Sequence, residues 1–438
     1  MTDAIKSFFE IDERQTTIRT EVVGGVTTFV TMAYIVAVNP GMLSQALGQD
    51  MFGELLFATC VGSAVATLIM ALGANYPFAL APGMGLNAMF TYTVVIGMGV
   101  RWDLALGVVL AAGLIFTLLS VLRLREALIN AVPTSLKHAT AAGIGLFIAF
   151  IGLKNAGIVS AHEATLVTLG SVRAGEAGLA IVGLLGTGVL VARGVRGSIL
   201  IGTAAVTVLA MGTGVAPPPS GLVAMPAWPE RMFGAALTHL PTAFSIALIE
   251  LVFVFLFVDL FDTMGTLVGL SQQSGMLDDR GHLPRANRAL LADSLGTVAG
   301  SLLGTSPVTT YIESASGITE GARTGLASVV VALLFLAALF FAPLVESVPL
   351  YATAPALVIV GVLMMAAVQR IDWGDATDAL PAFLTLLVMP LTFSIANGVA
   401  AGIVVYPVVK RLSGRGQDVH PLLDVLAVLF IARYLFVQ

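Results

Sequence analysis

Long runs of apolar residues, separated by short polar segments, follow one another along the whole chain. A helix needs about 20 apolar residues to cross a bilayer, because each residue advances it by about 1.5 Å. The first half of the chain predicts seven such spans, at residues 20–38, 53–73, 79–96, 102–122, 136–153, 177–193 and 197–214. The second half predicts seven more, at residues 243–270, 286–304, 306–321, 323–342, 349–368, 379–395 and 397–410. We therefore expect an all-α polytopic membrane protein with 14 transmembrane segments.

The lysines and arginines agree with this topology. With the N-terminus inside, 17 of the 21 basic residues lie in cytoplasmic segments, and 4 lie outside. Short loops on the cytoplasmic side of membrane proteins carry this excess of positive charge. We expect both termini in the cytoplasm and the protein in the plasma membrane, which in a bacterium is the inner membrane. No short apolar core of a cleavable signal precedes the first span, so that span is predicted to direct insertion.

An extracellular linker at residues 216–242, which contains PPP and PAWPE, divides the spans into two sets of seven. Because seven is odd, the two sets insert in opposite orientations, which is the geometry of inverted repeats. We predict a first repeat at residues 1–215 and a second at 243–411. The tail at 412–438 is expected to be cytoplasmic, with an amphipathic stretch on the membrane surface.

Two corresponding spans are interrupted. Span 79–96 contains Pro82 and Gly83, and span 306–321 contains Pro307 followed by β-branched residues. Proline removes a helical hydrogen bond, and β-branched residues favour extended chain. Each span is therefore predicted to enter as a short extended stretch and to continue as a short helix. The spans enter from opposite sides, so these stretches can pair antiparallel. Interrupted spans paired in this way mark the site of a transporter.

The starts of the two short helices bring polar residues to one place. Free N–H groups at these starts would point into a common space. Asn87 lies in the first turns after one break, and Glu313 and Ser314 lie at the other. As an alternative, proline and glycine only kink ordinary helices, and Asn87 bonds across a helix pair. His138, at the start of span 136–153, is interpreted as an interfacial anchor.

Asp259 and Asp262 lie within the apolar span 243–270. A charged group at this depth costs a few kcal/mol or more. Three residues apart on a helix, the two side chains share one face. The predicted spans contain no deeply placed lysine or arginine to neutralise them, so we expect them to face Glu313 in a functional site. A purely structural pair of acids is the alternative.

Composition excludes several classes of function. The chain is 57% hydrophobic and 11% charged, with a mean hydropathy of +0.96, whereas soluble domains are about 25% charged. The single cysteine, Cys60, cannot form an internal disulfide, and no cysteine–histidine cluster predicts a metal. We expect no cofactor and no nucleic-acid partner. The chain has no nucleotide-binding GxxxxGK[ST] loop and no recognisable catalytic constellation, so we expect neither an ATP-driven pump nor an enzyme.

Four blocks of sequence resemble the nucleobase–ascorbate transporter superfamily, specifically its AzgA-like branch of purine permeases. The blocks are FFEIDERQTTIRTEVVGGVTTFVTMAYIVAVNP, APGMGLNAMF, FVDLFDTMGT and TSPVTTYIESASGITEGARTG. The resemblance implies 14 spans in 7+7 inverted repeats, a core domain from spans 1–4 and 8–11, and a gate domain from spans 5–7 and 12–14. It also implies a homodimer. The FDTMGT form favours hypoxanthine, guanine or adenine over uracil or xanthine.

By the matching motifs, the resemblance implies that the substrate site is lined by Gly85, Asn87, Asp259, Asp262 and Glu313. We expect uptake of a purine nucleobase by proton symport with alternating access. The carboxylates would accept hydrogen bonds from the base edge.

Asp259 is expected to contact the base, together with Glu313 and Ser314, and Phe255 to provide an apolar wall. Asp262 is expected to support Asp259 or to carry the proton, although any of the three acids could do so. Sodium coupling is an alternative, because carboxylates also bind Na⁺. A chain with these spans could instead be a uracil or xanthine permease of the same fold, a channel or an anion exchanger. Three acids in the site would repel an anion.

Overall fold

The computed structural model describes residues 2–122, 132–173, 175–245, 248–274, 276 and 283–436. The elements of the first half are α1 (Thr2–Phe8), α2 (Ile18–Met32), α3 (Ile35–Leu47), η1 (Gln49–Met51), α4 (Phe52–Ile69), η2 (Met70–Ala74), β1 (Leu80–Pro82), α5 (Met84–Ala88), η3 (Met89–Gly97), α6 (Trp102–Val121), α8 (Thr134–Asn155), β2 (Val159–His162), β3 (Leu166–Leu169), α9 (Gly175–Ala192) and α10 (Ser198–Gly212).

The elements of the second half are α11 (Ala235–Ala243), α12 (Ile249–Ser274), α13 (Ala286–Leu303), β4 (Val308–Thr310), α14 (Ser314–Thr319), α15 (Gly325–Ala338), η4 (Leu339–Phe341), α16 (Ala342–Glu346), α17 (Leu350–Met365), η5 (Ala366–Arg370), α18 (Ala376–Leu391), α19 (Ile395–Leu412), η6 (Gly416–Asp418) and α20 (Pro421–Phe436). In the described part of the chain, nine helices are long and apolar enough to cross a membrane. The prediction of a mostly helical polytopic membrane protein is confirmed.

Several boundaries differ from the predicted ones. The first span extends beyond residue 38. Its helix is interrupted at Ala33 and Tyr34 and then continues as α3 to Leu47. The span predicted from residue 243 begins only at Ile249, since the separate helix α11 precedes it. The hairpin of β2 and β3, between α8 and α9, was not predicted. Its β3 strand is fully exposed, so no buried apolar pattern announces it.

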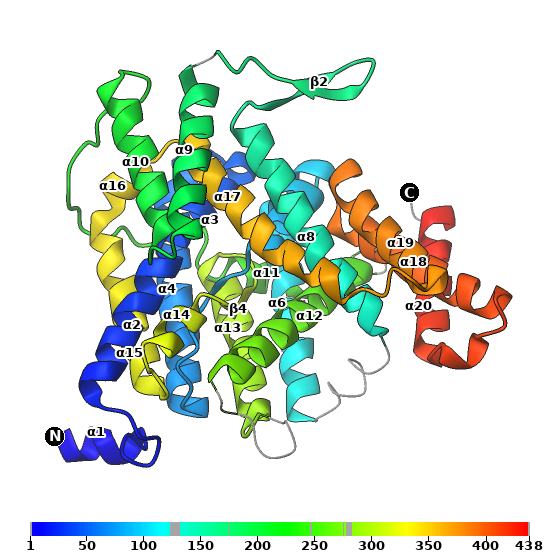
Figure 1. Cartoon of the computed structure of the whole chain (residues 1–438), viewed down its shortest axis with the longest axis horizontal. Coiled ribbons are helices and arrows are strands. Elements are labelled where there is room, and N and C mark those ends of the chain that lie inside the picture. The colour runs from blue at the N-terminus through cyan, green and yellow to red at the C-terminus, as the bar shows by residue number, and fades with distance from the viewer. Residues whose placement is uncertain are drawn as a thin grey trace.

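Helix packing sorts the elements into two groups. In the first group, α2 packs on α14 and α15, and α13 packs on α4 and α6. In the second, α17 packs on α8 and α9, and α18 packs on α8 and α19. Contacts between the groups are fewer, and several involve α8 or α17. In Figure 1, α2, α4, α14 and α15 lie together on one side, whereas α18, α19 and α20 lie on the other.

The two broken segments meet as a ribbon of extended chain inside the first group. β1 and β4 pair antiparallel, with Leu80 opposite Thr310 and Pro82 opposite Val308. Every residue of both strands is buried. Backbone N–H and C=O groups at this depth have no water to bind, so the outer edges of the ribbon need partners from the protein.

Side chains of α4 and α13 provide these partners. The Thr67 hydroxyl accepts a hydrogen bond from Leu80 N at 2.9 Å and donates one to Leu80 O at 3.0 Å. On the other edge, Thr297 Oγ1 donates to Val308 O at 2.9 Å. Asp293 Oδ1 accepts from Thr310 N at 2.9 Å and from Thr310 Oγ1 at 3.0 Å. The ribbon is therefore held between two helices by hydrogen bonds on both edges.

A buried ion pair joins the helices at the end of the second group. Lys410 is only 2% exposed, and its Nζ lies 2.9 Å from Asp378 Oδ2 and 3.5 Å from Asp375 Oδ2. Hydrogen bonds from Thr377 and Arg415, together with the charge of Lys410, hold the pKa of Asp375 below its usual range. A buried ammonium group needs such partners, because an unpaired charge in the interior is strongly unfavourable.

Glycines allow α8 and α17 to cross closely within the second group. A Cβ atom at Gly145 would lie 2.7 Å from the carbonyl oxygen of Gly361, and one at Gly361 would collide with the carbonyl oxygen of Gly145. Small residues at helix crossings are typical of membrane proteins, where close packing replaces the hydrophobic effect.

Gly145→Leu is expected to destabilise the protein by about 1–3 kcal/mol, because the added side chain overpacks this crossing. The measurement is thermal unfolding of the purified protein in detergent. Gly186→Leu in α9 is the matched control, since a Cβ there meets no neighbouring atom. An equal Tm for the two variants would contradict the prediction.

Candidate functional site

A cavity of about 460 Å³ lies between the two helix groups. The first group lines it with residues from the α2–α3 turn, α5, α12 and the β4–α14 segment, namely Tyr34, Gly83, Met84, Gly85, Phe261, Asp262, Gly265, Thr266, Gly269, Thr309, Thr310, Tyr311, Ile312 and Glu313. The second group lines it with residues from α8, α17 and η5, namely His138, Ala141, Val360, Leu363, Met364, Ala366, Ala367 and Arg370. The position between two separately packed groups suits a ligand site whose walls can move.

Two of the predicted carboxylates, Asp262 and Glu313, reach this cavity. Asp262 lies beside the start of α5, because a Cβ at Gly83 would be 3.6 Å from its Oδ2. Glu313 is the residue directly before α14, and its Oε1 accepts a hydrogen bond from the Tyr34 hydroxyl at 2.6 Å. Both carboxylates come from the first group, one from the long helix α12 and one from the broken segment.

Asp259 lies one turn before Asp262 but does not line the cavity. It is 3% exposed, and Thr297 Oγ1 lies 3.4 Å from its Oδ2. The same threonine hydroxyl bonds β4, so Asp259 sits on the α13 side of the ribbon. A rotation of about 60° between residues three apart on a helix is enough to separate the two environments.

The other predicted site residues divide between the cavity and its support. Gly85 lines the cavity, and a Cβ there would collide with Ile144 of α8. Asn87 is fully buried and accepts from Ser306 Oγ at 2.6 Å. Ser314 Oγ accepts from Ala79 N at 2.9 Å. Asn87 and Ser314 therefore tie the two broken segments together, and neither belongs to the cavity wall.

Phe255 is fully buried and also lies away from the cavity. The aromatic wall comes from Phe261, whose ring centroid lies 4.4 Å from that of Phe257, and from Tyr34 and Tyr311. Tyr311 is held in turn by the bond from its hydroxyl to Pro82 O at 2.5 Å. These rings offer flat apolar surfaces close to the two carboxylates.

Sequence reasoning missed several residues at the site. Asp293 is fully buried and also accepts from Thr263 Oγ1 at 2.7 Å. An acid within the predicted span 286–304 was a signal of the same kind as Asp259. Tyr34 gave no such signal, because its partner Glu313 lies 279 residues away. His138, interpreted as an interfacial anchor, lines the cavity together with Arg370.

The cavity walls carry opposite electrostatic character. The first group presents the carboxylates Asp262 and Glu313, and the second presents the basic side chains His138 and Arg370. Carboxylates accept hydrogen bonds, whereas the guanidinium group only donates them. A ligand with donors on one edge and acceptors on another would find partners on both walls. Among the described residues, no three or more His, Cys, Asp or Glu side chains cluster as metal ligands would.

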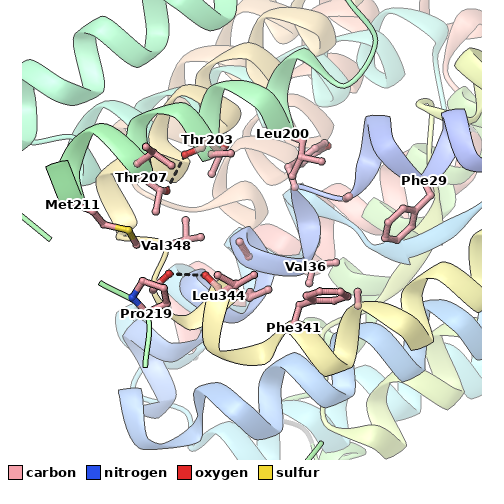
Figure 2. Close-up of a pocket in the computed structure, with 18 residues that line it drawn as sticks. Phe29, Val36, Leu200, Thr203, Thr207, Met211, Pro219, Phe341, Leu344 and Val348 are labelled. Atoms are coloured by element: carbon pink, nitrogen blue, oxygen red, sulfur yellow. Dashed lines mark hydrogen bonds between the residues drawn. The ribbon is translucent and has the colours of Figure 1, made fainter. Parts of the chain in front are cut away.

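A second pocket, of about 410 Å³, is a poorer site for a polar ligand. Figure 2 shows it between α10, the α2–α3 region and the segment around Phe341 and Val348. Its lining, among the described residues, contains no charged side chain. Two of its hydroxyls are already bonded to backbone, since Thr207 Oγ1 donates to Thr203 O at 2.8 Å and Ser347 Oγ to Leu344 O at 2.7 Å.

At the other end of α8 the two groups are in contact. α8 has 22 residues, so its ends lie about 33 Å apart. Its last turn belongs to what we call the aromatic cluster, defined as Tyr92, Thr93, Lys154, Asn155 and Phe393. Lys154 Nζ lies 5.4 Å from the ring centroid of Tyr92 and 5.2 Å from that of Phe393. Asn155 Nδ2 donates to Tyr92 Oη at 3.4 Å, and Thr93 Oγ1 donates to Phe393 O at 3.0 Å.

Asp293→Ala is expected to destabilise the protein by at least about 2 kcal/mol, because it leaves the buried N–H of Thr310 without its acceptor. Thermal unfolding in detergent measures the loss. Glu163→Ala, at an exposed position in the β2–β3 hairpin, is the control and should leave the Tm unchanged. If both variants unfold at the wild-type temperature, Asp293 does not hold β4.

Comparison with known proteins places this geometry in context. Residues 19–400 match the model of a family described as a permease family. The chain is 46% identical to the guanine/hypoxanthine permease PbuG of Bacillus subtilis, over 99% of this chain and 100% of that protein. It is 41% identical to the adenine permease AdeP of Escherichia coli, over 99% and 96%. A solved structure, the transmembrane domain of the cyanobacterial bicarbonate transporter BicA, is similar in fold, with a TM-score of 0.61 at 18% identity over 86% of this chain and 97% of that one.

Proposed function

The chain belongs to the permease family, and on that premise we propose that it takes up purine nucleobases by proton symport with alternating access. The observation that carries the proposal is the cavity between the two helix groups, with Asp262 and Glu313 beside aromatic rings. The full-length similarity to guanine/hypoxanthine and adenine permeases supports the choice of substrate.

A purine base has two flat faces and a rim of donors and acceptors, and the cavity suits both. Phe261 and Tyr311 offer rings to the faces, while Asp262 and Glu313 accept from ring N–H and exocyclic amino groups. A volume of about 460 Å³ lies within the usual range for small-molecule sites, roughly 300–1,000 Å³. Asp262 takes the contact that the sequence assigned to Asp259, because Asp259 lies beside α13 and outside the cavity lining.

We propose 14 crossings in two inverted repeats. The nine long helices account for nine crossings. The remaining five would be β1 with α5 and η3, α10, α13, β4 with α14, and α18. The two ribbon strands occupy corresponding places in the two halves, which supports the repeat. The first group then corresponds to the core domain and the second to the gate domain.

We propose that the cavity opens toward the cytoplasm. It lies at the end of α8 that carries His138, and the distribution of basic residues along the sequence predicts that this end is cytoplasmic. The aromatic cluster closes the opposite, extracellular side of the interface. Sliding the first group against the second would break this cluster and close the inner mouth, which moves the site from one side to the other.

The proton has a physical role in this cycle. A carboxylate accepts the N–H donors of a base best when it is ionised, but an ionised group without a partner is costly at bilayer depth. In symport the proton enters together with the base, so protonation of one acid would leave the loaded site with a single ionised carboxylate, and this second acid would keep the base bound. The protonated acid still accepts a hydrogen bond through its carbonyl oxygen, and the empty site would return without the proton. We propose Asp262 as the proton carrier and Glu313 as the principal acceptor of the base edge.

Wild-type protein in liposomes is expected to concentrate radiolabelled hypoxanthine under an inward proton gradient. Asp262→Asn and Glu313→Gln should each lower uptake at least tenfold, because each removes a charged acceptor worth roughly 1.5–3 kcal/mol. Glu163→Gln is the control. Undiminished uptake by both site variants would contradict the assignment of these residues. Accumulation driven only by a sodium gradient would show that the coupling ion is Na⁺ and not H⁺. Competition by guanine, adenine, xanthine and uracil identifies the preferred base.

Weakening the aromatic cluster is expected to expose the interface between the two helix groups to the extracellular solution. The only native cysteine, Cys60, is buried, so Asn155→Cys can serve as a reporter in intact cells. Adding Phe393→Ala should speed its labelling by a membrane-impermeant maleimide several-fold, because the ring no longer seals the interface. Leu166→Cys, 78% exposed in the hairpin, should label equally in both backgrounds. No change at the reporter would contradict the proposed closure.

A further inference from the structure

Tyr34 occupies the break in the first span, at the turn between α2 and α3. It is 1% exposed. Because its hydroxyl is buried in an apolar span, it needs a hydrogen-bond partner within the protein. The residue lines the site cavity on one side and the apolar pocket of Figure 2 on the other. Tyr34 therefore forms part of the wall between a polar and an apolar space.

The hydroxyl of Tyr34 is committed to Glu313. It donates to Oε1 at 2.6 Å, a length typical of a strong bond between a hydroxyl and a carboxylate. The bond joins the α2–α3 turn to the residue that precedes α14, and α2 and α14 also pack directly. The two ends of the bond therefore belong to one packed unit, so the distance between them is fixed by the fold.

Resting on the proposed function, we infer that Tyr34 is a positioning residue that raises the affinity for N–H-donating bases by orienting Glu313. A glutamate side chain has several rotamers, and ordering it upon binding would cost affinity. The Tyr34 bond orders the carboxylate in advance and directs it along the cavity wall. The ligand class is a flat heteroaromatic base with an N–H donor on the edge that meets Glu313.

The test compares Tyr34→Phe, which keeps the ring and removes the hydroxyl, with Tyr351→Phe. Tyr351 is also buried, but its hydroxyl has no hydrogen-bond partner in the described part of the chain and lies outside the cavity lining. We expect Tyr34→Phe to raise the KM for hypoxanthine about tenfold, equivalent to 1.4 kcal/mol, with a Vmax within about twofold of wild type. Tyr351→Phe should change neither constant.

Glu313→Asp shows whether Tyr34 acts through the carboxylate. This change keeps the charge but withdraws it by one methylene, out of reach of the Tyr34 hydroxyl. Tyr34→Phe should therefore raise the KM less than twofold in the Glu313→Asp background, a non-additivity that a general packing defect would not produce. An unchanged KM in Tyr34→Phe, or an equal increase in Tyr351→Phe, would overturn the inference.

If Tyr34→Phe does not fold, Tyr34→His and Tyr34→Leu decide the question. The histidine N–H can still bond Glu313, so hypoxanthine should raise the Tm of Tyr34→His more than that of Tyr34→Leu. Equal shifts would reject the role of Tyr34. Uptake by the wild-type protein is measured in parallel. If the wild type takes up no base, the proposed function itself is rejected. If the wild type is active and the Tyr34 variants behave like it, only this inference is rejected.

Discussion

The site depends on the satisfaction of backbone hydrogen bonds at bilayer depth. Extended chain cannot exist there with bare edges, because each unsatisfied N–H or C=O group costs several kcal/mol. β1 and β4 pair with each other, while Thr67 on one edge and Asp293 and Thr297 on the other bond the groups that point outward. The ribbon is therefore rigid, and the short helices that follow it start from fixed positions.

This rigid ribbon determines which polar groups can reach the cavity. Glu313 lies three residues after the end of β4, and Gly83 and Gly85 follow β1, so these residues lie at the wall between the helix groups. The opposite wall comes from α8, α17 and η5, which pack in the other group. BicA is similar to this chain in fold alone. The two carboxylates on one wall of the cavity are the feature on which the proposal of a hydrogen-bond-donating ligand rests.

Some residues that the sequence singles out by their own chemistry do line the cavity. Asp262 and Glu313 were recognisable as acids within apolar spans, and Gly85 as part of an interrupted one, and all three line the cavity. Asp259 gave the same signal but lies beside Thr297. Spacing along the helix places the side chains of Asp259 and Asp262 about 60° apart. Which of the two faces the cavity depends on how α12 packs. Tyr34 was missed because its significance lies entirely in a partner distant in sequence.

The composition alone was enough to predict the class of protein, because a chain with so many apolar and so few charged residues cannot cover its surface with polar groups and is stable in lipid rather than in water. It also determined where helices break, because proline and β-branched residues act on the local backbone. Three features could be found only in the folded chain: Asn87 and Ser314 join the broken segments, Asp262 reaches the cavity, and Tyr34 bonds Glu313. These outcomes depend on contacts between residues far apart in the chain, and no local pattern specifies the orientation that packing imposes on each helix.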